Sequence, residues 1–437
     1  MLNMKPNRTS FGNTKVKGFC IFLIGLLVCI FVFILIVKYI HNVNASGVGK
    51  GTYYSEKCWV PKGRDSCAPQ FIIAGAMKCG TTSLWSYLLQ HPNVLPLVKH
   101  VIDPKGLRDV LAEKEVRFFN DPGYSQLTKA YGKGKATGYY LDLFDPSIKP
   151  TFDMQEIEKN ITGEATPMYI NSIGTVDRIL STLPYVKLMI ILRNPIDRAY
   201  SDYWFHKTLK TGSQLTSDPK STTGYTHEEL FEQCMNIELD IIKFCKLDQW
   251  ADNPNHDSIF PITQCLRSTS KLVYTPTDQA SSCKKSELKH ICLSEAQKIY
   301  CPHMILVNSV YAFQILEWYL KVPKGNLLIL RSEDLFDEPT AVMSEVSSFL
   351  NIRDIDWTSI TNKTFNIVNP KTLAGSKTEI ITNTETKKNL QIGSSDSASD
   401  YPALSPIIRE HLLAKMASFN DGLARLVGDS KFMKWNF

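Results

Sequence analysis

A loop of small residues between a short apolar run and a helical pattern is the feature that most limits how this chain can fold. Residues 71–74 read Phe-Ile-Ile-Ala, and the loop that follows carries glycines at positions 75 and 80 before a helical pattern begins near Thr81. A strand, a small-residue turn and a helix in this order aim backbone N–H groups and a helix N-terminus at an anion. The chain therefore predicts an α/β domain with a phosphate site.

The position of the lysine in this loop separates two classes of phosphate-binding protein. In nucleoside-triphosphate P-loops a lysine directly follows the second glycine, whereas here Thr81 follows Gly80 and the lysine lies inside the loop as Lys78. A P-loop kinase or NTPase is therefore the weaker interpretation. It is weakened further because the apolar run 186–192 leads into arginine, where such enzymes would place a metal-binding aspartate.

Two further apolar runs, residues 186–192 and 327–330, are as short and as rich in branched residues as the first, which is typical of buried parallel strands. Helical patterns are expected near residues 81–90, 196–210, 227–246, 309–321, 337–350 and 404–427, and irregular structure at 211–226 and 373–400. Strands that alternate with helices predict a P-loop-type parallel sheet covered by helices on both faces. Its ligand should bind at the carboxyl ends of the strands.

The segment after the second strand offers a second anion site. Arg193 follows the last residue of the strand, Pro195 suits the first turn of a helix, and Ser201 lies two turns further on. A guanidinium fork with a hydroxyl suits a terminal phosphate monoester. In the alternative interpretation, Arg193 and Asp197 only cap and brace the helix.

A membrane anchor sets the expected compartment. Residues 18–37 carry no charge and are numerous enough to cross a bilayer as one helix. Four basic residues and no acidic residue precede them, so the positive-inside rule places residues 1–17 in the cytosol and the chain after the anchor in the lumen. A cleaved signal peptide is the alternative, but the run is longer than usual and no small-x-small site follows it directly. We therefore expect one uncleaved N-terminal transmembrane helix and a lumenal stem at residues 38–67.

The cysteines suit an oxidising lumen. Apart from two in the anchor and Cys79 in the loop, the chain has eight, an even number that predicts disulfides: Cys58, Cys67, Cys234, Cys245, Cys265, Cys283, Cys292 and Cys301. Cys58 can pair with Cys67, and the other six lie in a polar region expected to be poor in core, inside an insertion at about residues 211–301. No CxxC pair occurs, so we expect no metal site. Glycosylation sequons usable in the lumen occur at Asn44, Asn160 and Asn362.

The charge excludes a nucleic-acid binder. The formal net charge is +6, but four of the 49 basic residues precede the anchor, which leaves 45 basic against 43 acidic residues. A polyanionic partner would need a local groove. The candidate cations for one are Lys99, Lys105, Arg108, Lys114, Arg117, Lys129, Lys133 and Lys135, and an ordinary solvated face explains them equally well.

These motifs together resemble the Golgi carbohydrate sulfotransferases, which use 3′-phosphoadenosine 5′-phosphosulfate (PAPS) as sulfo donor. The similarity covers residues 68–437, which the resemblance makes a lumenal sulfotransferase domain. Besides the two anion motifs, it rests on the stretches Lys-Glu-Val-Arg-Phe-Phe at 114–119, Gly-Glu-Ala-Thr-Pro at 163–167, Leu-Arg-Ser-Glu-Asp-Leu at 330–335 and Phe-Asn-Asp-Gly-Leu at 419–423. The enzymes that sulfate the 6-hydroxyl of N-acetylgalactosamine 4-sulfate are the most similar within the family, on features such as Tyr-Leu-Asp-Leu-Phe at 140–144 and Tyr-Ser-Asp-Tyr at 200–203.

The resemblance implies a role for each motif. Lys78, Cys79, Gly80, Thr81 and Thr82 would bind the 5′-phosphosulfate of PAPS, with Lys78 also stabilising the leaving oxygen. Arg193 and Ser201 would bind the 3′-phosphate. Glu115 would be the base that takes the proton of the acceptor hydroxyl. No metal is required by this scheme.

The base has an alternative. In the family the glutamate follows a His-Pro pair by about eight residues, and counting from Pro92 reaches His100, whereas Glu115 lies 23 residues on. Either residues 97–113 are an insertion, or His100 replaces the glutamate as a base of near-neutral pKa. The two phenylalanines that follow in the same stretch favour Glu115.

The expected protein is a single-pass type II Golgi membrane enzyme that sulfates a sulfated glycosaminoglycan. The similarity favours the 6-hydroxyl of N-acetylgalactosamine 4-sulfate in chondroitin or dermatan sulfate as acceptor. Heparan sulfate is an alternative acceptor, and a catalytically inactive relative that binds glycans is an alternative function. A homo-oligomer is compatible with the sequence.

Overall fold

The computed structural model describes residues 51–55, 57–99, 114–150, 159–211, 220–252, 254–274, 292–293, 301–361 and 401–436. The predicted anchor at residues 18–37 lies outside these ranges, as do Asn44, His100, Asn362 and the segment 373–400. Within the described residues, no helix combines the length and the apolar character needed to cross a membrane.

A five-stranded sheet in the order β4-β5-β3-β6-β7 forms the centre of the molecule, and every neighbouring pair in it is parallel. The strands are β3 (Phe71–Gly75), β4 (Val94–Leu95), β5 (Ile161–Ala165), β6 (Lys187–Leu192) and β7 (Leu327–Arg331). The three strands predicted from apolar runs are confirmed as β3, β6 and β7. All residues of β3 and β5 are buried.

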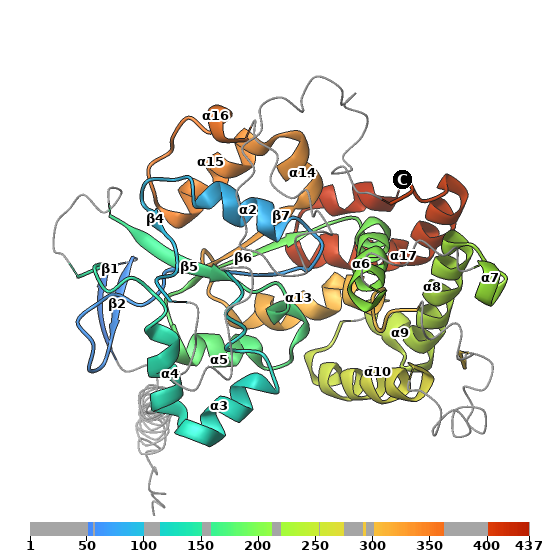
Figure 1. The fold of residues 1–437 in the computed structure, drawn as a ribbon, viewed down its shortest axis with the longest axis horizontal. Coiled ribbons are helices and arrows are strands. Elements are labelled where there is room, and N and C mark those ends of the chain that lie inside the picture. Colours follow the sequence, from blue (N-terminus) through green and yellow to red (C-terminus); the bar gives the residue numbers. More distant parts are fainter. Residues whose placement is uncertain are drawn as a thin grey trace, which may run out of the picture.

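Helices cover both faces of this sheet, as predicted (Figure 1). On one side lie α2 (Thr81–Leu88), α14 (Ser332–Asp337) and α15 (Pro339–Leu350), and on the other α5 (Thr175–Thr182) and α13 (Tyr311–Lys321). Beyond the end of the sheet stand α6 (Pro195–Thr211) and α17 (Pro406–Val427), which contact each other. With α8 (His227–Phe244), the six predicted helices are all present.

The described part of the cysteine-bearing region is mostly helical and is richer in core than the sequence suggests. Its helices are α8 (His227–Phe244), α9 (Leu247–Asp252) and α10 (Ile259–Tyr274), and Thr226 and Glu229 form a capping box at the start of α8. The inner face of α8 buries leucine, phenylalanine and isoleucine side chains in the same cluster as the sheet. The expectation of a poor core was wrong because the apolar residues recur at helical spacing rather than in a run.

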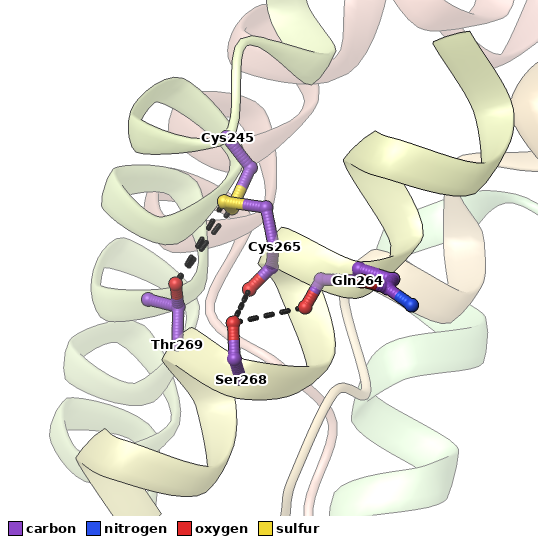
Figure 2. The surroundings of a disulfide bond; sticks show 5 residues. All are labelled: Cys245, Gln264, Cys265, Ser268 and Thr269. Atoms are coloured by element: carbon purple, nitrogen blue, oxygen red, sulfur yellow. Dashed lines mark hydrogen bonds between the residues drawn. A yellow bond between two sulfur atoms is a disulfide. The ribbon is translucent and has the colours of Figure 1, made fainter. Parts of the chain in front are cut away.

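Three disulfides are present among the described residues, Cys58–Cys67, Cys234–Cys301 and Cys245–Cys265. The first confirms the predicted pairing. The third joins the end of α8 to α10, with the Thr269 hydroxyl 3.8 Å from both sulfur atoms (Figure 2). Cys292 is also disulfide-bonded, and Cys283 lies outside the described residues.

Smaller elements complete the fold. Residues assigned to the stem include an antiparallel hairpin of β1 (Gly51–Ser55) and β2 (Cys58–Pro61). The other helices are α3 (Gly123–Tyr131), α4 (Lys133–Leu141), α7 (Lys220–Thr223) and α16 (Thr358–Thr361), with 3-10 turns η2 (Tyr169–Asn171), η4 (His256–Ser258), η7 (Val307–Ser309) and η10 (Ser430–Asn436). α7 lies in a segment expected to be irregular.

Candidate active site

The phosphate loop, which we define as residues 76–80, leaves β3 at its carboxyl end and leads into α2. The Ala76 N–H donates to the carbonyl of Ile191 on β6 at 2.8 Å. Lys78 and Gly80 have φ values of 68° and 89°, in the left-handed region. At Gly80 a side chain would also be crowded, since an added Cβ would lie 3.3 Å from the Phe336 ring. The loop is therefore a constrained turn that ends directly at a helix N-terminus.

The N-terminus of α2 is suited to an anion. Gly80 is the N-cap residue and supplies no side-chain cap, and the first turn carries no acidic residue. The first N–H groups of a helix have no partner within the helix, so those of the first turn can point at a ligand. The residues predicted to bind the phosphosulfate, from Cys79 to Thr82, lie here.

The Lys78 amine reaches from this loop to α6. Its Nζ lies 4.4 Å from the centre of the Phe205 ring. Burial lowers the pKa of Lys78, while the nearby Asp202 carboxylate raises it and the Arg193 guanidinium lowers it. Ser201 is one helical turn before Phe205, so both stand on the same face of α6.

Tyr311 links the loop to the second anion motif. Its hydroxyl donates to the carbonyl oxygen of Arg193 at 2.9 Å and lies 3.6 Å from the Cys79 sulfur. Arg193 emerges at the carboxyl end of β6, and Ser201 is buried on α6. The fold thus brings Lys78 close to Arg193 and Ser201, which lie more than 100 residues later in the sequence.

Asn194 and Asp197 both take part in bracing the start of α6. Asn194 Oδ1 accepts from the N–H groups of Ile196 and Asp197 at 3.0 and 3.3 Å, which caps α6. Both oxygens of Asp197 accept from Arg409 of α17 at 2.9 Å. Asp197 therefore braces α6 against α17, as the alternative interpretation expected, and the residue that caps α6 is Asn194.

A buried ionic network that the sequence reasoning missed supports the loop. Arg198, fully buried, donates to Met77 O at 3.4 Å, to Asp202 Oδ2 at 3.2 Å and to Ser309 Oγ at 2.7 Å, and also to Ile305 O. A signal was available, because Arg198 and Asp202 have the i,i+4 spacing of a helical ion pair. One guanidinium therefore ties the loop to α6 and to the segment before α13.

The candidate base Glu115 lies beside the carboxyl end of β5. The Ala165 N–H of β5 donates to the carbonyl of Lys114, the residue before Glu115, at 3.0 Å. The Glu115 carboxylate is 17% exposed and pairs with Arg117 Nη2 at 3.0 Å and Lys114 Nζ at 3.6 Å. Because β5 is adjacent to β3, Glu115 is at the same edge of the sheet as the phosphate loop.

One sequence expectation in this region changes, and another stays a prediction. Lys114, a candidate for an acceptor groove, is only 2% exposed and is held against Glu115, so it does not form part of an exposed basic face. The alternative base, His100, lies outside the described residues, as do Lys105 and Arg108.

Glu164 on β5 is a second site residue that the sequence reasoning missed. The sequence marks Glu164 only as part of the stretch Gly-Glu-Ala-Thr-Pro at 163–167 that resembles the family, and assigns it no role. Its carboxyl is fully buried and accepts hydrogen bonds from the hydroxyls of Tyr140, Thr166 and Tyr169 at 3.1, 2.6 and 2.9 Å. Burial raises the pKa of Glu164 to about 7. A charged residue inside a short strand was the available signal.

The other predicted sites concern metal binding and glycosylation, and the structure describes only some of their residues. Among the described residues, no group of three or more His, Cys, Asp or Glu side chains could hold a metal ion, and metal independence stays a prediction. Asn160 is exposed, as glycosylation requires, and its Oδ1 accepts from Asn93 Nδ2 at 3.3 Å.

Comparison with known proteins gives a family match over most of the chain. The family described as "Sulfotransferase domain" matches residues 68–412. Among solved structures, a sulfotransferase from Alicyclobacillus acidocaldarius is 18% identical with a TM-score of 0.40, covering 83% of this chain and 98% of that one.

Three curated relatives are similar over about two thirds of this chain. The membrane-associated sulfotransferase kil1 of Dictyostelium discoideum is 25% identical over 69% of this chain and 59% of its own length. Rat carbohydrate sulfotransferase 15 is 27% identical over 65% of this chain and 44% of its own length. The mouse bifunctional heparan sulfate N-deacetylase/N-sulfotransferase 4 is 24% identical over 65% of this chain and 22% of its own length. The chain thus spans less than two thirds of each relative.

Proposed function

Because the chain belongs to the sulfotransferase domain family, we propose that it transfers a sulfo group from PAPS to a hydroxyl group of a glycan. The observation that carries this proposal is the meeting of two anion-binding motifs at one edge of the sheet. Tyr311 contacts both the phosphate loop and Arg193, and Arg198 bonds the loop from α6. A ligand with two phosphate groups can therefore place one phosphate at each motif.

The side chains and backbone groups present fit such a donor. The N–H groups of residues 79–82 suit the 5′-phosphate at the start of α2. The Arg193 guanidinium and the Ser201 hydroxyl suit the 3′-phosphate. Lys78 lies over the face of α6 that carries Ser201, so its amine stands between the two motifs.

When bound, PAPS supplies the sulfo group and a phosphate leaving group. The Lys78 amine then stabilises the negative charge that builds on the bridging oxygen, and this stabilisation is strong because the amine is largely buried. The Glu115 carboxylate takes the proton of the attacking hydroxyl. Its position beside β5 supports this role, because β5 neighbours the strand that leads into the phosphate loop.

We further propose that the acceptor is N-acetylgalactosamine 4-sulfate in chondroitin or dermatan sulfate, sulfated at its 6-hydroxyl. The name of one relative, carbohydrate sulfotransferase 15, supports a carbohydrate acceptor, and that of another supports heparan sulfate as the competing choice. A lumenal Golgi location behind a single anchor is part of the same proposal. The three disulfides support it, because such bonds persist in oxidising compartments.

The test is a transfer assay with the full chain purified from secretory cells. It is incubated with PAPS carrying radiolabelled sulfate and with chondroitin 4-sulfate, dermatan sulfate, heparan sulfate or unsulfated chondroitin. We expect label on the first two, at the 6-hydroxyl after disaccharide analysis, and activity that survives a metal chelator. Lys78→Ala is the matched control, and its turnover should fall by about 10²–10³-fold while it still binds adenosine 3′,5′-bisphosphate.

Each other outcome has a definite meaning. Label on heparan sulfate alone would replace the proposed acceptor. Label on no glycan, with glycan binding retained, would indicate an inactive relative. Phosphate transfer from ATP that requires magnesium would identify a P-loop kinase instead.

A further inference from the structure

The buried carboxylate of Glu164 accepts hydrogen bonds from several elements outside its own strand. It lies in the middle of β5 and accepts from three hydroxyls, those of Tyr140 on α4, Thr166 just after β5, and Tyr169 on η2. The backbone N–H of Val116 is a fourth donor. An ionised carboxylate accepts about four such bonds and donates none, so these donors match it fully.

Two of these hydroxyls continue to the segment that carries Glu115, which we call the base segment (residues 114–119). Thr166 Oγ1 donates to Glu164 Oε2 at 2.6 Å and accepts from the Arg117 N–H at 3.1 Å. The Tyr169 hydroxyl donates to Glu164 Oε1 at 2.9 Å and accepts from the Phe119 N–H at 3.4 Å. Together with the direct bond from Val116, Glu164 holds three backbone N–H groups of the base segment.

The backbone geometry of the base segment explains why it needs such support. Arg117 has a φ of 56°, a left-handed conformation that a non-glycine residue adopts at a cost. The same Arg117 holds Glu115 Oε2 with its side chain. A change in the backbone at residue 117 would therefore move the carboxylate of Glu115 as well.

We propose that Glu164 is a positioning residue of the reaction: through the Val116 N–H and the two bridging hydroxyls it fixes the base segment so that the Glu115 carboxylate stands at the acceptor hydroxyl. This rests on the proposed function, in which Glu115 is the base. Glu164 itself is fully buried, so in this proposal it acts through the base segment and not on the reacting atoms.

Glutamine is the sharpest substitution, because it keeps the shape of Glu164 but turns one acceptor oxygen into an amide donor. That amide would face hydroxyl and N–H donors, and at least one bond to the base segment would be lost. A matched control exists in Glu238 on α8, another fully buried carboxyl that accepts from backbone N–H groups, here those of Ile305, Leu306 and Val307 at 2.8–2.9 Å.

The first arm measures amide hydrogen exchange in the full chain, which requires no enzymatic activity. In Glu164→Gln the amides of residues 114–119 should exchange at least about tenfold faster, while those of residues 305–307 keep their rates. In Glu238→Gln the pattern should be reversed. Unchanged exchange at residues 114–119 in Glu164→Gln would overturn the proposal.

The second arm measures turnover in a double-mutant cycle. Glu164→Gln should lower kcat by up to about 100-fold and leave the Kd for adenosine 3′,5′-bisphosphate within about twofold. In a Glu115→Gln background the same substitution should add almost no loss, because a positioning residue acts only through the base. Equal losses in both backgrounds would show that Glu164 does not act through Glu115. A wild-type chain that transfers no sulfo group at all would instead overturn the proposed function.

A milder pair of variants covers the case in which Glu164→Gln fails to fold. Tyr169→Phe removes the hydroxyl that joins Glu164 to the Phe119 N–H, and Tyr140→Phe removes one that donates to Glu164 from α4. Both keep their rings. Tyr169→Phe should speed exchange at Phe119 and lower kcat more than Tyr140→Phe does, and equal effects would count against the proposal.

Discussion

At the scale of single residues, the environment of Lys78 shows how the loop sets the charge of its lysine. Burial lowers the pKa of Lys78, the Asp202 carboxylate opposes this, and the guanidinium groups of Arg193 and Arg198 add to the lowering. Asp202 is itself buried against Arg198. The acidic residue on α6 therefore helps to keep the amine protonated, which is the form that can stabilise a departing oxygen.

We predict that Arg193 contributes more to nucleotide binding than Ser201 does. Arg193→Ala should weaken the binding of adenosine 3′,5′-bisphosphate by about 1.5–3 kcal/mol, because it removes a charge-assisted contact to the 3′-phosphate. Ser201→Ala removes a neutral hydroxyl and should cost less. Isothermal titration calorimetry measures both. Asp197→Asn, which affects the Arg409 brace on α17 rather than the ligand, is the control, and an equal loss in it would indicate a general disturbance of α6.

The positions of the proposed anion-binding residues were predictable, whereas the residues that hold them in place were not. Local patterns place Lys78 and Arg193 just after strands and Ser201 on the helix that follows β6. Arg198 works through Ser309 and Met77, which are 111 and 121 positions away in the sequence. Glu164 lies on β5, a strand that no sequence pattern revealed. A buried charged side chain is stable only when donors or acceptors form hydrogen bonds with it. Because these partners come from distant parts of the sequence, only the fold shows which residues they are.

At the scale of elements, the sequence reveals strands that are purely apolar and misses the one that is not. β3, β6 and β7 were predicted from branched apolar runs, but β5 was missed, since Gly163 and Glu164 interrupt it. Both residues have structural reasons. Glu164 anchors the base segment, and Gly163 lies against β3, its partner in register being Phe71. The short strands and helices at the N-terminal side were missed for lack of a long periodic pattern.

We predict that Gly163→Ala destabilises the sheet. An added Cβ would lie 2.3 Å from the backbone oxygen of Phe71 and 2.7 Å from its ring, and a central strand cannot move away without losing ladder bonds. The free energy of unfolding should fall by about 1–3 kcal/mol, a typical cost of overpacking.

Gly134→Ala on α4 is the matched control. Nothing lies within 4 Å of its added Cβ, and alanine favours a helix by about 0.5–1 kcal/mol. Urea denaturation of both variants beside the wild type makes the measurement. A Gly163→Ala protein as stable as the wild type would contradict the tight approach of β5 to β3.

At the scale of the whole molecule, one edge of the sheet gathers the chemistry. The strands β5, β3 and β6 lie side by side in the sheet (Figure 1). β3 leads into the phosphate loop, Arg193 follows β6, and the segment of Glu115 is bonded to the end of β5. A parallel sheet makes this edge predictable, because the carboxyl ends of all its strands meet there. The strand order was not predictable, since β5 was missing from the prediction and lies next to β3.

Two buried carboxyls in this fold should make stability depend on pH. Burial raises the pKa of both Glu164 and Glu238 to about 7, from an ordinary value of 4.5. Tyr140 and Tyr169 face the first, while Tyr274 and Arg198 face the second. Between pH 4.5 and 7 the folded chain binds protons that the unfolded chain has released.

We therefore predict that the free energy of unfolding falls as pH rises from 4.5 to 7, by up to about 1.4 kcal/mol per pH unit for each carboxyl. The contribution is complete below pH 4.5 and is lost as pH passes through 7, because a raised pKa favours the protonated folded state. Urea unfolding followed by tryptophan fluorescence at pH 5, 6 and 7 measures the slope for the wild type, Glu164→Gln and Glu238→Gln. Because glutamine does not titrate, each substitution should remove the contribution of one carboxyl to this slope, up to about 1.4 kcal/mol per pH unit. If both variants kept the wild-type slope, the two carboxyls would have to be ionised throughout this range, and their hydrogen-bond donors rather than their burial would dominate their pKa.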